Sequence, residues 1–314
     1  MQQILTIIGP VFGLIAIGFA LGRTPLMTAE GVKGLTNFVF YAAIPALLFR
    51  SMARTTLPAA DDLVLVVTYF GTLGAVFLLS MAIARFVFRL NLADQGLFAM
   101  GAIFGNTVLA GIPIVYAAFG EPGLVPLLLI IVFHPTLIFP LVTLIIEASL
   151  GRGGGAWRTI RATARSLVTN PVIVALLAGI GWNIMGLVIP GGIDSFLKLL
   201  GGAAAPAALF ALGATLTRFK LASGLAENAT MSIIKLAVLP TVIWISLTML
   251  TDLPRLWIAV AVVTAALPTG ANVFLLAQRY NIYVARTSTV VLASTAASAV
   301  TLSLVLIWLG ASSG

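Results

Sequence analysis

Hydrophobic residues run along this chain in long segments that short polar connections separate. An α-helix needs about 20 apolar residues to cross roughly 30 Å of hydrocarbon, and nearly all of the segments reach that length. The pattern therefore predicts an all-α integral membrane protein with ten membrane-spanning helices. The predicted spans cover residues 4–22, 32–53, 63–87, 95–119, 123–147, 168–189, 195–217, 230–250, 255–279 and 283–309.

Composition supports a membrane location and excludes several classes of function. Hydrophobic residues make up 61% of the 314 residues, charged residues make up 8%, and the mean hydropathy is +1.15, far above the soluble range. With no cysteine and one histidine, the chain is expected to have no disulfide, no metal site and no cofactor. It has no phosphate-binding loop motif. Its net charge of +8 is spread between apolar segments, so we expect no nucleic-acid partner.

Basic residues are distributed unevenly between the two sides that ten spans define. The connections after spans 1, 3, 5, 7 and 9 carry 13 of the 17 Lys and Arg residues, and the opposite side carries four. Short cytoplasmic loops are enriched in Lys and Arg. We therefore expect the odd-numbered connections in the cytoplasm and both termini on the outer side.

Short sequence patterns recur in the two halves of the chain. The matching pairs are Gly9-Pro10-Val11 with Asn170-Pro171-Val172, Gly18 with Gly179, and Pro45–Phe49 with Pro206–Phe210. Because each half holds five spans, the second half must be inserted upside down relative to the first. We predict two inverted five-helix repeats, residues 1–149 and 168–314. A basic cytoplasmic linker, residues 150–167, joins them, and its segment 157–165 is expected to form a short helix on the headgroups.

Gly and Pro interrupt two of the predicted spans near mid-length, one in each half. Proline removes a backbone donor, and glycine lowers the cost of leaving helical geometry. An unpaired backbone group in hydrocarbon costs several kcal/mol, so such breaks face protein or a water-filled cavity. Paired interruptions in corresponding spans indicate the binding site of a secondary transporter. We predict that spans 4 and 9 unwind near Gly105–Pro113 and Pro268–Asn272 and cross each other; the alternative is two ordinary proline-kinked helices.

The motifs in these spans resemble the auxin efflux carrier family, which includes plant exporters and bacterial organic-acid carriers. The motifs are Phe104-Gly105-Asn106-Thr107, Gly111-Ile112-Pro113, Phe133-His134-Pro135, Ala266-Leu267-Pro268-Thr269-Gly270 and Tyr280-Asn281. The resemblance covers essentially the whole chain. It departs at Gly105, where plant exporters have a proline, and at the linker, which replaces a long cytoplasmic loop.

The resemblance implies a fold similar to sodium–proton antiporters and bile-acid symporters. Spans 1, 2, 6 and 7 would form a scaffold, and spans 3–5 and 8–10 a transport domain with broken crossover helices 4 and 9. It further implies elevator-type alternating access in a bacterial inner membrane, both termini periplasmic, with membrane lipids around the chain and a homodimer formed through the scaffold. The implied substrate is a small organic carboxylate, either auxin-like or a dicarboxylate.

The residues at the two interruptions are the candidate substrate-binding residues. They are Gly105, Asn106, Thr107, Pro268, Thr269, Gly270 and Asn272. The N-terminus of a half-helix carries roughly +0.5 of an elementary charge, which suits a carboxylate. An asparagine amide donates two hydrogen bonds, so Asn106 and Asn272 either bind the anion or repair the broken backbone, and both readings stay open.

Ionisable residues inside spans are functional candidates. His134 lies near the middle of span 5 and is a further candidate binding residue, although the favoured interpretation is that its ring bonds a carbonyl freed by Pro135. Lys235 and Arg50 are expected to line the vestibules, or Lys235 to extend to the headgroups. Glu147 is expected to pair with an arginine.

No Asp or Glu falls near the middle of any predicted span, which disfavours a two-carboxylate cation antiporter. We therefore expect a transporter of small organic anions. Coupling would be absent, or would use sodium or a proton. The alternatives are an anion-selective channel and a sodium- or proton-coupled symporter of another small organic solute. No arrangement typical of an enzyme is present.

Overall fold

The protein consists of helices joined by short connections in the residues that its computed structural model describes, which are 2–55, 63–151, 161, 165, 168–221 and 224–310. The first half contains α1 (Gln2–Gly22), α2 (Ala29–Phe38), α3 (Ile44–Met52), α4 (Leu63–Phe86), α5 (Leu92–Ile103), α6 (Ile112–Phe119) and α7 (Leu124–Ser149). The second half contains α9 (Pro171–Ile184), α10 (Gly191–Gly202), α11 (Ala204–Leu216), α12 (Leu225–Ile233), α13 (Leu239–Leu250), α14 (Arg255–Ala265), α15 (Asn272–Tyr280) and α16 (Val284–Trp308). The helix expected at 157–165 lies largely outside the described residues.

Six helical stretches in the described chain are long and apolar enough to cross a membrane. They are Ala29–Met52, Leu63–Phe86, Glu121–Ser149, Gly191–Leu216, Leu225–Leu250 and Val284–Trp308. The sequence predicts ten spans, with spans 4 and 9 interrupted, and the described chain does not confirm all ten as helices of spanning length. Predicted spans 95–119 and 255–279 are each divided into two shorter helices, and predicted span 168–189 contains the 14-residue α9. The fold is therefore that of an all-helical, multi-pass membrane protein.

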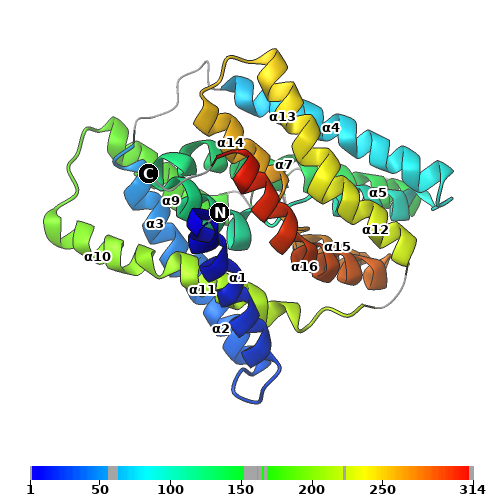
Figure 1. The fold of residues 1–314 in the computed structure, drawn as a ribbon, viewed down its shortest axis with the longest axis horizontal. Coiled ribbons are helices and arrows are strands. Elements are labelled where there is room, and N and C mark those ends of the chain that lie inside the picture. The colour runs from blue at the N-terminus through cyan, green and yellow to red at the C-terminus, as the bar shows by residue number, and fades with distance from the viewer. Residues whose placement is uncertain are drawn as a thin grey trace.

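The helices form two groups in space (Figure 1). In one group, α1 packs against α11, and α3 packs against both α9 and α10. In the other group, α4 packs against α5 and α13, α13 packs against α14, and α12 packs against α16. Two separate clusters of buried hydrophobic side chains lie within the molecule. One cluster includes residues of α1, α3 and α11 together with residues of α6, α7, α14 and α16, so apolar packing also joins the two groups.

Glycines allow two pairs of helices in the first group to approach closely. A Cβ atom placed on Gly18 of α1 would lie 2.2 Å from the carbonyl oxygen of Phe210 in α11. A Cβ on Gly179 of α9 would lie 2.7 Å from the carbonyl oxygen of Phe49 in α3. Both distances are shorter than side chains tolerate, so both positions require glycine. The two contacts join equivalent positions of the two sequence halves, in opposite order.

Three short π-helices widen helical stretches at prolines. They are η1 (Val39–Ala43), η3 (Thr107–Gly111) and η5 (Ile234–Val238). In each case a proline, Pro45, Pro113 or Pro240, is the second residue of the α-helix that follows. Proline lacks an N–H and clashes with the preceding turn, and a π-turn relieves this by bonding one residue further back. The chain therefore passes these prolines without leaving the helix.

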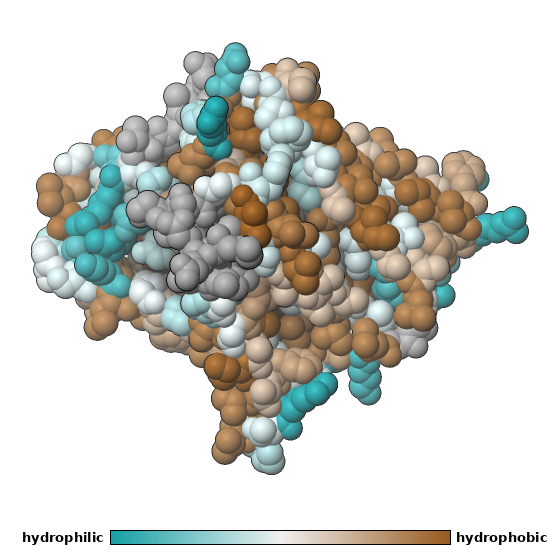
Figure 2. Space-filling model, in the orientation of Figure 1, coloured by the Kyte–Doolittle hydropathy of each residue, from teal (hydrophilic) through white to brown (hydrophobic). Residues whose placement is uncertain are grey.

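Much of the face drawn in Figure 2 is apolar. On α4, Val67 is 71% exposed and Leu78 is 67% exposed; on α13, Met249 is 75% exposed. Exposed apolar side chains in such number would aggregate in water, but they match a lipid surround.

Candidate functional site

The two helix interruptions lie against each other at the centre of the site. Residues 104–106 separate α5 from η3, and residues 266–271 separate α14 from α15. Gly105 and Thr269 form an antiparallel β-bridge. The Asn106 N–H donates to the Pro268 carbonyl at 2.9 Å, and the Gly270 N–H donates to the Phe104 carbonyl at 2.9 Å. We call these two segments, with the residues that start the helices after them, the crossover.

The first interruption is shorter than the sequence predicted. Its expected range extended to Pro113, but the chain is helical again from Thr107, first as the π-helix η3 and then as α6. Pro113 is accommodated by the π-turn described above, so the unwound part is limited to Phe104–Asn106. At the second interruption Pro268 is unwound as expected, whereas Asn272 is already the first residue of α15.

Close backbone approach accounts for the glycine at position 270, whereas a Cβ at position 105 would make only ordinary contacts. A Cβ on Gly270 would lie 3.1 Å from the Gly105 carbonyl oxygen and 3.1 Å from the Phe104 ring. A Cβ on Gly105 would meet the Lys235 ammonium and the Thr264 carbonyl at 3.5 Å each. Gly270 therefore permits the close approach at the bridge, and both glycines contribute backbone rather than side-chain groups to the site.

The amides of Asn106 and Asn272 do not repair the broken backbone. Asn106 is half-buried and Asn272 is exposed. Asn106 precedes η3 but forms no side-chain cap, and neither side chain has a hydrogen-bond partner within the described chain. The backbone groups of the interruption are instead satisfied by the bridge and by local turns. Both amides thus keep their full hydrogen-bonding capacity for another molecule.

The two threonines differ in how far they are committed to the structure. The Thr269 hydroxyl donates to the Gly101 carbonyl at 2.9 Å, and the Thr269 N–H donates to the Ser294 hydroxyl at 3.0 Å. Thr107 is buried, and its N–H donates to the Gly105 carbonyl at 2.9 Å. Thr269 therefore anchors the bridge to α5 and α16.

His134 contacts the crossover directly. Its side chain on α7 is 1% exposed, and its Nε2 atom accepts a hydrogen bond from the Gly105 N–H at 3.2 Å. The ring also packs on Phe104 with a centroid distance of 4.5 Å. The favoured expectation, a bond to a carbonyl freed by Pro135, is therefore wrong. Because Nε2 is an acceptor, the neutral ring carries its proton on Nδ1, which has no partner among the described residues.

Lys235 is a site residue that sequence reasoning placed wrongly. It is fully buried on η5, and its ammonium donates a hydrogen bond to the Ala265 carbonyl at the end of α14. It neither lines a vestibule nor reaches the headgroups. The predicted span began at residue 230, which put Lys235 near a membrane surface; the helical stretch in fact begins at Leu225 and places it near mid-length. A lone lysine inside an apolar run was the available signal.

Two further side chains have partners other than those expected. Arg50 does not line an open vestibule, because it forms ion pairs with Glu121 at 2.9 Å and Asp194 at 2.8 Å. Glu147 accepts a hydrogen bond from the Tyr280 hydroxyl at 3.1 Å, whereas the sequence predicted an arginine partner. Both residues lie away from the crossover bridge.

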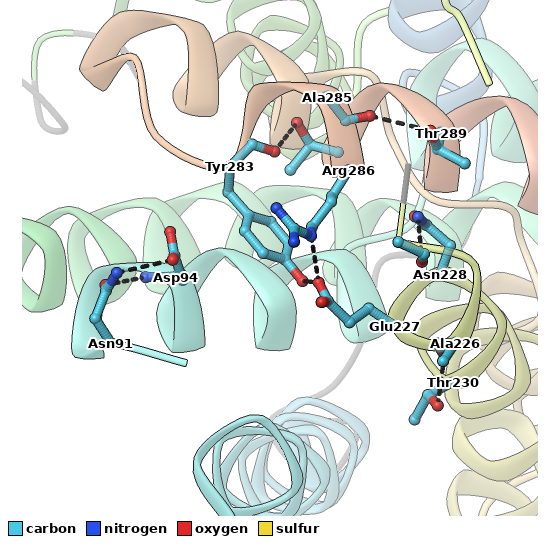
Figure 3. A network of polar contacts seen from close by, with 12 residues as sticks. Asn91, Asp94, Ala226, Glu227, Asn228, Thr230, Tyr283, Ala285, Arg286 and Thr289 are labelled. Atoms are coloured by element: carbon cyan, nitrogen blue, oxygen red, sulfur yellow. Dashed lines mark hydrogen bonds and ion pairs between the residues drawn. The ribbon is translucent and has the colours of Figure 1, made fainter. Parts of the chain in front are cut away.

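A polar network joins the starts of α12 and α16 (Figure 3). Glu227 forms an ion pair with Arg286 at 2.6 Å and accepts a hydrogen bond from the Tyr283 hydroxyl. Asp94 lies nearby on the first turn of α5, held by the Asn91 amide at 2.8 Å. In the part of the chain that the structure describes, these acidic groups and the histidine do not gather into a metal-binding cluster.

Sequence comparisons place the chain among membrane transporters. The model of the family described as "Membrane transport protein" matches residues 3–154 and 156–306. A Rhizobium meliloti (strain 1021) protein named "Putative malonate transporter" is 30% identical over 301 residues, which cover 96% of this chain and 94% of that protein. "Uncharacterized transporter YfdV" of Escherichia coli (strain K12) is 25% identical over 293 residues, 90% of either chain. The chain therefore belongs to the membrane transport protein family, the auxin efflux carrier family that its motifs resemble, and is a transporter rather than an enzyme.

Proposed function

We propose that this protein carries small organic carboxylate anions across a bacterial inner membrane and binds them at the crossover. The observation that carries the proposal is the pair of bridged helix interruptions, beside which the Asn106 and Asn272 amides have no partner in the described chain. Two helices, η3 and α15, begin at the bridge. Their N-terminal ends and the two amides offer hydrogen-bond donors, which a carboxylate requires.

The charges around the crossover favour an anion over a cation. Lys235 places a buried amine beside Gly105, and we propose that it carries a proton when an anion is bound there. None of the Asp and Glu side chains in the described residues is buried, so no carboxylate competes for that charge at the centre of the protein. A positive group in a low-dielectric site stabilises a bound anion more strongly than it would in water. The site is then shaped by the backbone of Gly105, Pro268, Thr269 and Gly270. His134 holds the first interruption in place through its hydrogen bond with the Gly105 N–H.

The architecture we propose is ten spans in two inverted repeats. The reciprocal contacts of Gly18 with Phe210 and of Gly179 with Phe49 support it, because an inverted repeat requires each contact to occur twice with the halves exchanged. Spans 1, 2, 6 and 7 would be the scaffold, represented by α1–α3 and α9–α11. The remaining helices would be the transport domain, which carries the crossover from one side of the membrane to the other in an elevator-type movement.

Malonate is the first substrate to test, because the name of the Rhizobium meliloti relative specifies it. Malonate has two carboxylates, and the crossover offers two amides and one ammonium. An auxin-like aromatic monocarboxylate is the comparison ligand. We propose no metal or cofactor, and leave the coupling ion, sodium or a proton, to the measurement.

The experiment is counterflow in proteoliposomes. Vesicles loaded with unlabelled malonate should accumulate labelled malonate from outside, and the rate should saturate with concentration. Conductive flux without saturation or counterflow would instead identify an anion-selective channel. Uptake that requires a sodium or pH gradient would identify a coupled symporter. Absence of flux for every carboxylate in a panel would refute the proposal.

Topology and assembly complete the proposal. Lys235 is buried at the crossover and is left out of the charge count. The odd-numbered connections then carry 12 Lys and Arg residues and the opposite side carries 4. We therefore propose that the odd-numbered connections are cytoplasmic and that both termini are in the periplasm.

We also propose a homodimer formed through the scaffold helices. Leu177 on α9 and Leu199 on α10 are 59% and 80% exposed, and such apolar faces are available for a second copy or for lipid. Native mass measurements in gentle detergent would show a dimer if the proposal is correct.

A further inference from the structure

Four charged side chains form a chain of ion pairs away from the crossover. Arg54 contacts Asp194 at 2.8 Å, Asp194 contacts Arg50 at 2.8 Å, and Arg50 contacts Glu121 at 2.9 Å. Charges alternate along this chain, so each internal member is neutralised on two sides. The Arg50 side chain is only 13% exposed and that of Asp194 only 17% exposed, and water therefore screens their contact weakly.

The last of these ion pairs connects the two helix groups. Arg50 lies on α3 and Asp194 on α10, and these helices pack against each other in the first group. Glu121 begins the 3-10 helix η4 (Glu121–Gly123), which contacts α6, α7 and α14. The α6 helix continues directly from the crossover through η3. The pair from Arg50 to Glu121 therefore ties η4, which packs against α14 of the second group, to α3 of the first group.

We propose that the ion pair between Arg50 and Glu121 is a latch that holds the two helix groups in the arrangement seen here and must open when they move. This inference rests on the movement in the proposed function, but not on the identity of the substrate. The latch gives the present arrangement an electrostatic stabilisation that a displaced arrangement lacks. Removing it should therefore shift the population between arrangements, as differential stabilisation requires.

When the latch opens, we expect the Glu121 side chain to move away while Arg50 stays in place. Its side chain is 41% exposed, so water can solvate the carboxylate when the pair opens. Arg50 keeps its contacts with Asp194, which accepts hydrogen bonds from both Nε at 2.8 Å and Nη2 at 3.4 Å. Gly120, with φ of +66°, precedes Glu121 and gives the connection a backbone conformation that favours glycine. The arginine is thus held on α3 while the acid is held only through a short loop.

The test uses Glu121→Gln, which keeps the side-chain shape but removes its charge. The chain has no cysteine, so a thiol-reactive spin label attaches only to cysteines that are introduced. We choose Leu26→Cys and Phe86→Cys. Leu26 is 80% exposed beside α1 and α2, and Phe86 is 75% exposed at the end of α4, one label on each helix group. Pulsed electron–electron double resonance then measures the distance distribution between the groups.

We expect Glu121→Gln to raise the ratio of the minor to the major distance population about two- to fivefold, the range for partly exposed ion pairs. Glu30→Gln is the matched control, because Glu30 is exposed at the start of α2 and forms no ion pair within the described residues. Salt at about 1 M, where the Debye length is about 3 Å, should raise the ratio in the unsubstituted protein more than in Glu121→Gln. Identical distributions in Glu121→Gln, Glu30→Gln and the parent would overturn the latch.

Counterflow separates this inference from the proposed function. If the parent protein exchanges malonate, Glu121→Gln should change the exchange rate about two- to fivefold and leave the substrate dissociation constant unchanged. If no carboxylate is exchanged while the distance population still shifts, the latch stands and the carboxylate proposal fails. If malonate is exchanged but neither the rate nor the population responds to Glu121→Gln, the latch fails and the carboxylate proposal stands.

Discussion

The two asparagines at the crossover allow a decisive test of the binding site. Asn106→Ala and Asn272→Ala each remove an amide that has no hydrogen-bond partner in the described chain. With no bond lost, the free energy of unfolding without ligand should change by less than about 0.5 kcal/mol. Asn272 is also the first residue of α15, where alanine is a better helix former. Neither variant should therefore melt markedly earlier than the parent protein.

Anion affinity should respond very differently. An amide that donates to a carboxylate forms a charge-assisted hydrogen bond, which contributes about 1.5–3 kcal/mol. Its loss should weaken malonate binding about tenfold to a hundredfold. Isothermal titration calorimetry on the purified variants measures the dissociation constant, and differential scanning calorimetry without ligand measures stability on the same samples.

Asn183→Ala is the matched control, because Asn183 is committed to the fold. Its amide nitrogen donates to the Met52 carbonyl at 3.0 Å and the Thr55 carbonyl at 2.7 Å. Removing two hydrogen bonds should cost about 1–3 kcal/mol of unfolding free energy, while the affinity of the folded fraction stays unchanged. If the two crossover variants behave like this control, with lost stability and unchanged affinity, the binding role of both asparagines is refuted.

Three further predictions address packing, charge and topology. Gly18→Ala should destabilise the protein by about 1–3 kcal/mol or more, because its Cβ would lie 2.2 Å from the Phe210 carbonyl oxygen. Gly13→Ala, with nothing within 4 Å, should stabilise α1 by about 0.5–1 kcal/mol; equal melting of the two variants would contradict the close approach of α1 and α11. Lys235→Met should keep the protein folded but weaken malonate binding at least about tenfold, whereas unchanged affinity in calorimetry would remove the lysine from the site. A cysteine replacing Gly154 should resist an impermeant thiol reagent added outside intact cells, because the linker is expected in the cytoplasm, and rapid labelling would reverse the topology.

The sequence by itself determined the membrane class and the positions of both helix interruptions. Both follow from local physics: long apolar runs have no stable place in water, proline removes a helical hydrogen bond, and glycine lowers the cost of leaving helical geometry. The motifs around Asn106 and Pro268 also identified the family, which the family model confirms. The length of the first interruption was less predictable. Whether Pro113 breaks a helix or is absorbed by a π-turn depends on the packing of the turn before it.

Tertiary structure alone decided how the site is assembled. The Gly105 N–H bonds His134, 29 residues away in sequence, and Lys235 bonds Ala265, 30 residues away. Such partners depend on how α5, α7, α14 and η5 pack together, and residue spacing carries no information about that packing. Arg50 shows the same principle, since its acids lie 71 and 144 residues away. Local sequence sets where a helix breaks, whereas long-range packing determines which polar groups satisfy one another and which, like the two crossover amides, have no partner in the described chain.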